Sequence, residues 1–137
     1  MDTEYKVNQP ISAQQFCDLL SNTSLGVRRP LDETQTIQGM LDNANLLVTA
    51  WQGDNLVGVA RCVTDFHYCC YMSDLAVDEG IQAKGIGKAL IRISKEQLKP
   101  KCSLILLAAP LAQDYYPKIG FEKHNSAWIL RDVNQLK

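Results

Sequence analysis

The sequence lacks the features that mark membrane proteins, secreted proteins and zinc proteins. No apolar run approaches the ~18 residues of a transmembrane helix. The first ten residues, MDTEYKVNQP, are acidic and polar, the reverse of a signal peptide. The five cysteines form no C-x-x-C pair, and their odd number among apolar neighbours predicts buried, reduced thiols. Reduced thiols are typical of cytoplasmic proteins, so we expect a cytoplasmic location. Since only two histidines are present, we expect no zinc site.

An excess of charge of either sign is also missing. The chain carries 14 Lys and Arg against 15 Asp and Glu, a formal net charge of −1. This balance gives no general attraction to nucleic acid or to an anionic membrane. The 137 residues, 46% of them apolar, are typical of a single globular domain that covers 1–137.

The first third of the chain has helical periodicity. Residues 12–21, SAQQFCDLLS, begin with a Ser that suits a helix cap and place three apolar residues on one face. Residues 32–42, DETQTIQGMLD, begin with acidic residues and repeat apolar positions at helical spacing. The loop between them, LGVRRPL, contains Pro30, which prevents one continuous helix.

After residue 45 the pattern changes to strands. We predict strands over 46–52 and 56–66, joined by a hairpin at Gly53-Asp54-Asn55, and a third over 68–77. A helix over 86–98, ended near Pro100, precedes a fourth strand over 103–109. That strand, SLILLAA, has no polar alternation, so we expect it to be central and covered on both faces. The order predicts an α/β fold, an α+β mixed sheet without internal repeats.

Between the third strand and the following helix lies QAKGIGK, residues 82–88. A P-loop requires glycine at the first position of its motif and a hydroxyl after the lysine, but Gln82 and Ala89 occupy these places. A dinucleotide-binding motif requires a small residue three positions after the second glycine, where Leu90 stands. Both nucleotide motifs are therefore excluded.

A Q-x-x-G-x-G pattern remains at the start of a helix. The first N–H groups of a helix have no acceptor within it, and the helix dipole makes them attractive to anions. Gly85 and Gly87 have no Cβ, so a pyrophosphate can approach the backbone, and Lys84 and Lys88 add positive charge. The alternative is that both glycines serve only a tight strand-to-helix turn.

Two stretches resemble one family. LAVDEGIQAKGIGKALI resembles the acetyl-CoA-binding motif of the GNAT N-acetyltransferase superfamily, and DYYPKIGF at 114–121 resembles a late segment of the same family. The resemblance covers residues 46–131 and is closest to short bacterial-type members. It implies a GNAT-like acyl-CoA N-acyltransferase fold with a mostly antiparallel sheet, flanking helices and one splayed pair of parallel strands.

The resemblance also implies where coenzyme A binds. In the family a bulge splays the strand before the phosphate loop from the next strand, and the pantetheine arm of acetyl-CoA lies between them. Here that strand ends in Leu75, Ala76 and Val77. The pyrophosphate would rest on Gln82, Ala83, Lys84, Gly85, Ile86, Gly87 and Lys88.

The chemistry implied by the resemblance centres on Tyr116. It aligns with the tyrosine that returns a proton to the departing thiolate, and the alternative is an aromatic packed beside Phe121. Tyr115 aligns with the usual Phe, so we interpret it as a packing residue. Relatives often carry a Glu that acts as the general base on this strand, and the corresponding positions here are Tyr71 and Ser73. Adjacent Asp74 points to the opposite face by strand alternation, which suggests a structural role. A further departure is Ala109, which stands where many relatives have an Asn.

The acceptor is less defined by the sequence. Arg28 and Arg29 lie in the loop that borders the acceptor pocket in the family and can receive a carboxylate or phosphate of the substrate. The alternative is a solvated basic loop. Scattered charges at Asp32, Asp65 and His67 would attract a cationic amine, or are ordinary surface charges.

Two functions follow as hypotheses. One is transfer of an acetyl group from acetyl-CoA to a primary amine of a small molecule or peptide; the other is a non-catalytic CoA-binding sensor or interaction module. The strand-like run at 126–131, SAWILR, allows either a homodimer or an ordinary edge strand of the chain's own sheet.

Overall fold

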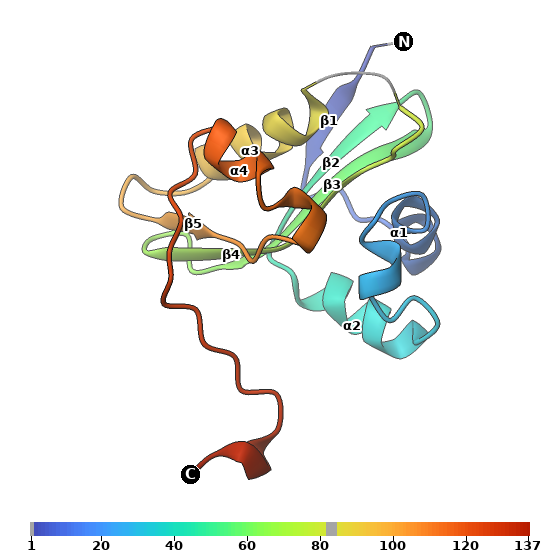
Figure 1. Ribbon diagram of the computed structural model, residues 1–137. Helices are drawn as coiled ribbons and strands as arrows, with labels where there is room; N and C mark the ends of the chain where they lie inside the picture. Colours follow the sequence, from blue (N-terminus) through green and yellow to red (C-terminus); the bar gives the residue numbers. More distant parts are fainter. Residues whose placement is uncertain (1, 82–84) are drawn as a thin grey trace. The chain divides into compact units, whose positions relative to one another are not determined.

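The computed structural model describes residues 2–81 and 85–137 (Figure 1). The chain divides into two compact units, residues 1–107 and 108–137. The prediction that 1–137 form one domain stays a prediction. Among the described residues, no helix is long and apolar enough to span a bilayer.

The first unit contains a five-stranded sheet and three α-helices. The strands are β1 (Glu4–Val7), β2 (Leu46–Gln52), β3 (Asn55–Thr64), β4 (Cys69–Val77) and β5 (Ser103–Ile105); the helices are α1 (Ala13–Leu20), α2 (Thr34–Asn43) and α3 (Ile86–Glu96), with a 3₁₀ turn, η1 (Gly26–Arg28).

The strands follow one another across the sheet in the order β1-β2-β3-β4-β5. The first three pairings are antiparallel and the β4–β5 pairing is parallel. This confirms the predicted mixed sheet with one parallel pair. The short β1 was not predicted, because it has only four residues and two of them are charged.

The prediction for residues 103–109 is wrong in position and extent. β5 ends at Ile105 and lies at the edge of the sheet, where Ile105 is 53% exposed and Leu107 is 49% exposed. A continuous apolar run shows that a strand lacks a polar face, but not which neighbours cover it. The strand buried along nearly its whole length is β2.

The helices cover opposite faces of this sheet (Figure 1). On one side α1 contacts β3, β4 and α2, and on the other α3 contacts β2, β3 and β4. The predicted Ser12 cap of α1 is present and forms a capping box with Gln15. In contrast, α2 begins at Thr34, later than predicted, and its cap position, Glu33, makes no side-chain cap bond.

Gly58 of β3 sets how closely α3 packs on the sheet. A Cβ at this position would lie 3.1 Å from Leu90 Cδ1 and 3.2 Å from Ile86 Cγ2. Both side chains are buried in the core between α3 and the sheet. The absence of a side chain at Gly58 therefore lets the first two turns of α3 approach the sheet closely.

The second unit is small and has little regular structure. It contains η2 (Pro110–Ala112), α4 (Tyr115–Lys118) and η3 (Val133–Gln135). The strand expected over 126–131 is not formed, and its side chains are exposed, with Trp128 at 92%. Since a strand needs a partner for its backbone groups, the apolar sequence alone does not produce one here.

Candidate functional site

The parallel strands β4 and β5 pair over only a short length. Their paired residues are Cys69 with Ser103, Cys70 with Leu104 and Tyr71 with Ile105. Beyond this point β5 ends, while β4 continues to Val77 and remains paired with β3 on its other side. In the described residues, the edge of β4 from Met72 to Val77 therefore has no strand partner. We call this edge the β4 wedge.

The β4 wedge begins at a β-bulge. Arg61 of β3 pairs with Asp74, but the next residue, Cys62, pairs with Met72, so Ser73 is an extra residue. An extra residue reverses which side chains face each side of a sheet. Accordingly Met72 belongs to the core under α3, and beyond the bulge Leu75 packs against that same core.

The reversal turns Asp74 to the face covered by α1 and α2. Its side chain is fully buried and lies between two arginines, Arg29 and Arg61. Arg29 Nε donates to Asp74 Oδ1 at 2.6 Å, and Arg61 Nε donates to Asp74 Oδ2. A buried carboxylate paired twice in this way is unsuited to act as a base, which agrees with the structural role expected for Asp74.

The two arginines of the predicted acceptor loop differ in their surroundings. Arg29 also donates from Nη2 to the Ser73 carbonyl at 2.8 Å and from Nη1 to the Arg28 carbonyl at 3.1 Å. Its guanidinium is therefore engaged by the protein itself. Arg28 is exposed at the end of η1, with its side chain toward solvent. No local pattern in the sequence indicates the Arg29–Asp74 pair, because its members are 45 residues apart.

The glycine-rich loop leads into α3 as predicted. Gly85 occupies the cap position with φ 86°, a conformation that favours glycine, and a Cβ there would meet none of the described residues within 4 Å. The first helical bond runs from Ala89 N to Gly85 O at 2.9 Å. The N–H groups of the first helical turn, Ile86 through Lys88, therefore precede any helical acceptor. The predicted contacts at Gln82, Ala83 and Lys84 lie outside the described residues.

Tyr116 lies in α4, in the second unit. Its ring makes an edge-to-face contact with Phe121, with centroids 5.2 Å apart, and another with Tyr115 at 5.3 Å. Burial, and secondarily Tyr115, raises the pKa of the Tyr116 phenol. The packing beside Phe121 is thus present, and the phenol holds its proton more firmly than a free tyrosine.

The turn between β3 and β4 is closed by Asp65. Its Oδ1 accepts from the backbone N–H groups of His67, Tyr68 and Cys69 at 2.8–3.0 Å. These bonds lower the pKa of Asp65 to about 2. Asp65 therefore stabilises the turn, which favours the interpretation of this residue as an ordinary surface charge over attraction of a cationic substrate.

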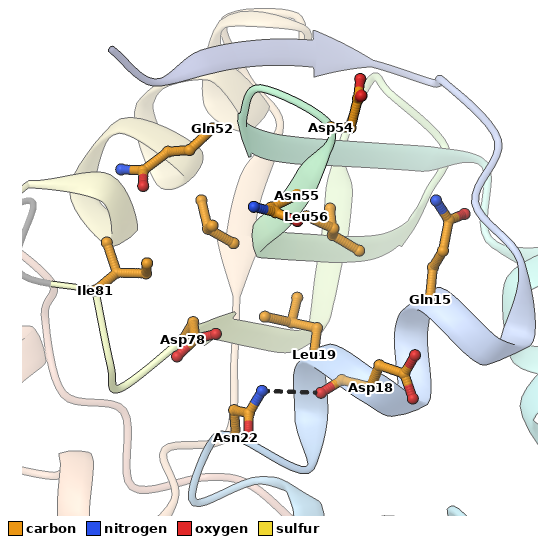
Figure 2. A pocket seen from close by; sticks show the side chains of 11 residues that line it. Gln15, Asp18, Leu19, Asn22, Gln52, Asp54, Asn55, Leu56, Asp78 and Ile81 are labelled. Carbon is orange, nitrogen blue, oxygen red and sulfur yellow. Dashed lines mark hydrogen bonds between the residues drawn. The ribbon is translucent and has the colours of Figure 1, made fainter. Parts of the chain in front are cut away.

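A cavity of about 390 Å³ opens on the α1 side of the sheet (Figure 2). Its walls come from α1, the β2–β3 hairpin and the residues after β4. Three aspartates line it, and among the described residues the lining includes no lysine, arginine or histidine; the lining residues are Gln15, Asp18, Leu19, Asn22, Gln52, Asp54, Asn55, Leu56, Val57, Asp78 and Ile81. None of the predicted acceptor residues belongs to it. The sequence offered no signal, because the three aspartates come from separate segments.

Comparison with known families decides the identity. Residues 22–132 match the family described as the acetyltransferase (GNAT) domain. This range is most of the chain and includes the β4 wedge, α3 and α4. The chain belongs to the GNAT acetyltransferase family.

Two curated relatives of this GNAT chain are described as an uncharacterized N-acetyltransferase ycf52 and a ycf52-like protein. The first, from Pyropia yezoensis, is 29% identical over 80% of this chain, and the second, from Prochlorococcus marinus, is 32% identical over 69%. The aligned part spans 63% and 54% of the lengths of these relatives.

Solved structures with the same fold cover nearly all of this GNAT chain. A GNAT family acetyltransferase of Streptococcus pneumoniae superposes with a TM-score of 0.75 and 21% identity, covering 96% of this chain and 100% of its own. A ribosomal-protein-alanine N-acetyltransferase of Brucella melitensis gives 0.71 and 22%, covering 96% and 99%. The aminoglycoside N-acetyltransferase AAC(6')-Iy, solved with CoA, gives 0.73 and 15%, covering 96% and 95%. At these identities the likeness concerns the fold.

Proposed function

We propose that residues 1–137 form a single N-acetyltransferase domain that transfers an acetyl group from acetyl-CoA to a primary amine of a small molecule or peptide. The observation that carries this proposal is the β4 wedge of a GNAT chain, a strand edge with no strand partner among the described residues, which is followed in the sequence by a glycine-rich helix start. We also propose a cytoplasmic location, which the five free thiols support.

The residues along the wedge suit coenzyme A. Leu75, Ala76 and Val77 lie on the unpartnered part of β4, where backbone groups can bind the amide-rich pantetheine arm as an added strand would. The lack of a side chain at Gly85 and the N–H groups of Ile86, Gly87 and Lys88 suit the pyrophosphate. By the sequence motif, Gln82, Ala83 and Lys84 complete that site.

The chemistry requires one proton acceptor and one proton donor. When bound, acetyl-CoA supplies a thioester that a neutral amine can attack, so an alkylammonium with a pKa near ~10.4 must first lose a proton. Neither Tyr71 nor Ser73 is a carboxylate, and Asp74 is paired with two arginines, so we assign the deprotonation to water. Tyr116, whose burial keeps its phenol protonated, donates to the leaving thiolate.

The charge of the cavity in Figure 2 supports a cationic acceptor. Its described lining carries Asp18, Asp54 and Asp78, and a primary amine in neutral solution arrives as an ammonium ion. Arg28, exposed on the neighbouring loop, is the candidate for an anionic group of the same substrate. An Asp78→Asn variant should raise the KM of a dicationic acceptor more than that of a monocationic one.

A second candidate function is a CoA-binding sensor without turnover. The observation that favours it is the engagement of Asp74 by Arg29 and Arg61, which leaves the described part of β4 without an available carboxylate. Such a protein would bind acetyl-CoA with the same wedge but release no thiol in the presence of amines.

Calorimetric titration with acetyl-CoA, followed by a screen of amines and peptides for thiol release, tests these proposals. Saturation at a hundred times the dissociation constant should stabilise the fold by about 2.7 kcal/mol. Gly85→Asn, which tolerates the left-handed conformation but adds a side chain, should weaken CoA much more than a pantetheine fragment. No binding of acetyl-CoA would contradict both candidates; binding without thiol release across the screen would favour the sensor.

A further inference from the structure

Two arginines from distant parts of the chain converge on the β-bulge of β4. Arg61 lies on β3, and Arg29 follows η1. Together they donate four hydrogen bonds to the two bulge residues: each binds Asp74 through Nε, Arg61 Nη2 donates to Ser73 Oγ at 2.9 Å, and Arg29 Nη2 donates to the Ser73 carbonyl at 2.8 Å. Ser73 and Asp74 are therefore held through side chain and backbone.

This network has an unusual energetic balance. The side chain of Asp74 is fully buried, and those of Arg61 and Arg29 are 8% and 20% exposed. Removing ions from water is expensive, and a buried ion pair is often no more stabilising than apolar residues of similar volume. Two guanidinium groups against one carboxylate also leave a net positive charge. Stability is thus a weak explanation for the network, and its geometry is the more informative property.

The network lies where the wedge begins. Pairing between β4 and β5 ends at Tyr71 and Ile105, and the extra residue of the bulge, Ser73, comes two residues later. A bulge bends its strand and increases the local twist. The position of β4 relative to β5 beyond Tyr71 therefore depends on how the bulge is held.

The same network reaches the elements that cover the opposite face. Arg61 Nη1 donates to the Met40 carbonyl of α2 at 3.2 Å, and Arg29 belongs to the loop that precedes α2. The planar guanidinium allows each arginine to bind the bulge and a second element at once. A lysine has one charged nitrogen and cannot reproduce this double attachment.

We propose that Arg29 and Arg61 are positioning residues that hold the bulge at Ser73–Asp74 and thereby set the opening of the β4 wedge for the pantetheine arm of acetyl-CoA. This inference rests on the proposed function and adds residues that act through β4 rather than by touching the cofactor. The hydrogen bonds of the network reach neither Gly85 nor α3. The inference therefore predicts an effect on binding at the β4 wedge and none on binding at the phosphate loop.

The test uses Arg29, which is partly exposed and so is the safer position for substitution. Arg29→Met keeps the aliphatic length without the donors, and Arg29→Lys keeps the charge without the fork. Arg92→Met, at an exposed position of α3, is the matched control. Calorimetry measures affinity for acetyl-pantetheine, which occupies the wedge alone, and for adenosine 3',5'-diphosphate, which lacks the pantetheine arm. Amide hydrogen exchange of 72–77 without ligand gives a second measurement.

Arg29→Met and Arg29→Lys should each weaken the binding of acetyl-pantetheine by about tenfold, because substitutions that act on a site through an intervening network change its affinity by roughly 2–30-fold. Affinity for the nucleotide should stay within about twofold, and exchange at 72–77 should accelerate; Arg92→Met should change neither. Equal losses of affinity for both fragments, an affinity of Arg29→Lys for acetyl-pantetheine equal to that of the parent, or unchanged exchange would overturn the inference. If the parent protein binds neither fragment, the proposed function itself fails and the inference falls with it.

Discussion

Two neighbouring tyrosines differ in burial, and this difference separates their expected roles. Tyr116 is half-buried with a raised phenol pKa, whereas Tyr115 is 40% exposed. Tyr116→Phe keeps the ring and its contact with Phe121 but removes the acidic proton. Loss of a general acid lowers a rate by ~10²–10⁴-fold. Since a thiol leaves readily, we expect kcat to fall by about 10²-fold, with little change in the affinity for acetyl-CoA.

The matched control is Tyr115→Phe, which should leave kcat within a few-fold of the parent. The pH profile adds a second criterion, because the raised pKa of Tyr116 keeps the acid protonated beyond its ordinary value of 10.0. The alkaline decline of kcat should therefore lie above pH 10.0 in the parent and be absent in Tyr116→Phe. A Tyr116→Phe enzyme as fast as the parent would refute the assignment.

Asp65 gives a prediction about acid stability. Its pKa is about 2 in the folded protein against an ordinary 3.8, because three backbone N–H groups stabilise the carboxylate. A depressed folded pKa contributes stability that is present above pH 3.8 and is lost as the pH falls toward 2. Asp65→Asn retains an oxygen acceptor but cannot ionise, so its free energy of unfolding should depend less on pH in this range.

Denaturant unfolding at a series of pH values measures the effect. Asp114→Asn removes one charge from a side chain that makes no cap hydrogen bond in α4, and it serves as the control for net charge. The slope of stability against pH should be smaller for Asp65→Asn than for Asp114→Asn. Equal slopes would mean that the turn bonds do not favour the ionised form.

At the scale of elements, the close packing of α3 on β3 depends on Gly58. A Cβ there lies 3.1–3.3 Å from Leu90, Ile86 and Ala50, so these buried groups must move. Overpacking of a core typically costs ~1–3 kcal/mol, and we expect Gly58→Ala to be destabilising by about that amount. Displacement of α3 should also weaken CoA, because the helix start carries the phosphate site.

Gly39→Ala is the contrasting substitution. Gly39 lies within α2, and a Cβ there has nothing within 4 Å. Alanine in a helix is favoured over glycine by ~0.5–1 kcal/mol, so this variant should gain stability. Denaturant midpoints at constant m-value measure both variants. If Gly58→Ala were as stable as the parent, α3 would have room that the structure does not show.

Local sequence predicted the elements better than their neighbours. The Ser12–Gln15 capping box and the periodicity of β2, β3 and α3 are encoded within a few residues, and those elements were found close to their predicted bounds. The edge position of β5 was not predicted, because an apolar strand carries no record of which strands adjoin it. The expectation of a strand over 126–131 was wrong for the same reason.

In the candidate site, too, the local features were predicted and the contacts between distant segments were not. The glycine motif lies within seven consecutive residues, and the helix start at Ile86 was predicted correctly. The bulge was expected from the family resemblance, and the register shift at Ser73 confirms it. The Arg29–Asp74–Arg61 network and the three-aspartate cavity join segments far apart in sequence, and no spacing rule connects such residues before the chain is folded.

At the scale of the whole molecule, exposed apolar groups predict association. Ile105 on the edge strand β5 and the segment 126–131, where Trp128 is 92% exposed, present surfaces that isolated chains seldom leave open. We expect two copies to cover these groups as a homodimer. Sedimentation at micromolar concentration should then give twice the 15.3 kDa of one chain.

The variant Trp128→Lys should shift this equilibrium to the monomer, while Val27→Lys, at an equally exposed position on η1, should leave it unchanged. Trp51, the other tryptophan, is buried, so quenching of fluorescence reports mainly Trp128. Quenching should fall as protein concentration rises. A single 15.3 kDa species at these concentrations would contradict the homodimer.

The connections between strands bear on how the chain acquires its shape during synthesis. Residues 53–54 join β2 to β3 and residues 65–68 join β3 to β4, so these three strands can pair as soon as they are made. β5 joins the sheet in parallel only after the whole crossover, 78–102, has been synthesised. The part of the sheet proposed to hold coenzyme A is thus assembled last, and in a nascent chain that ends before residue 103 the edge of β4 that faces away from β3 is open to chaperones and to other chains.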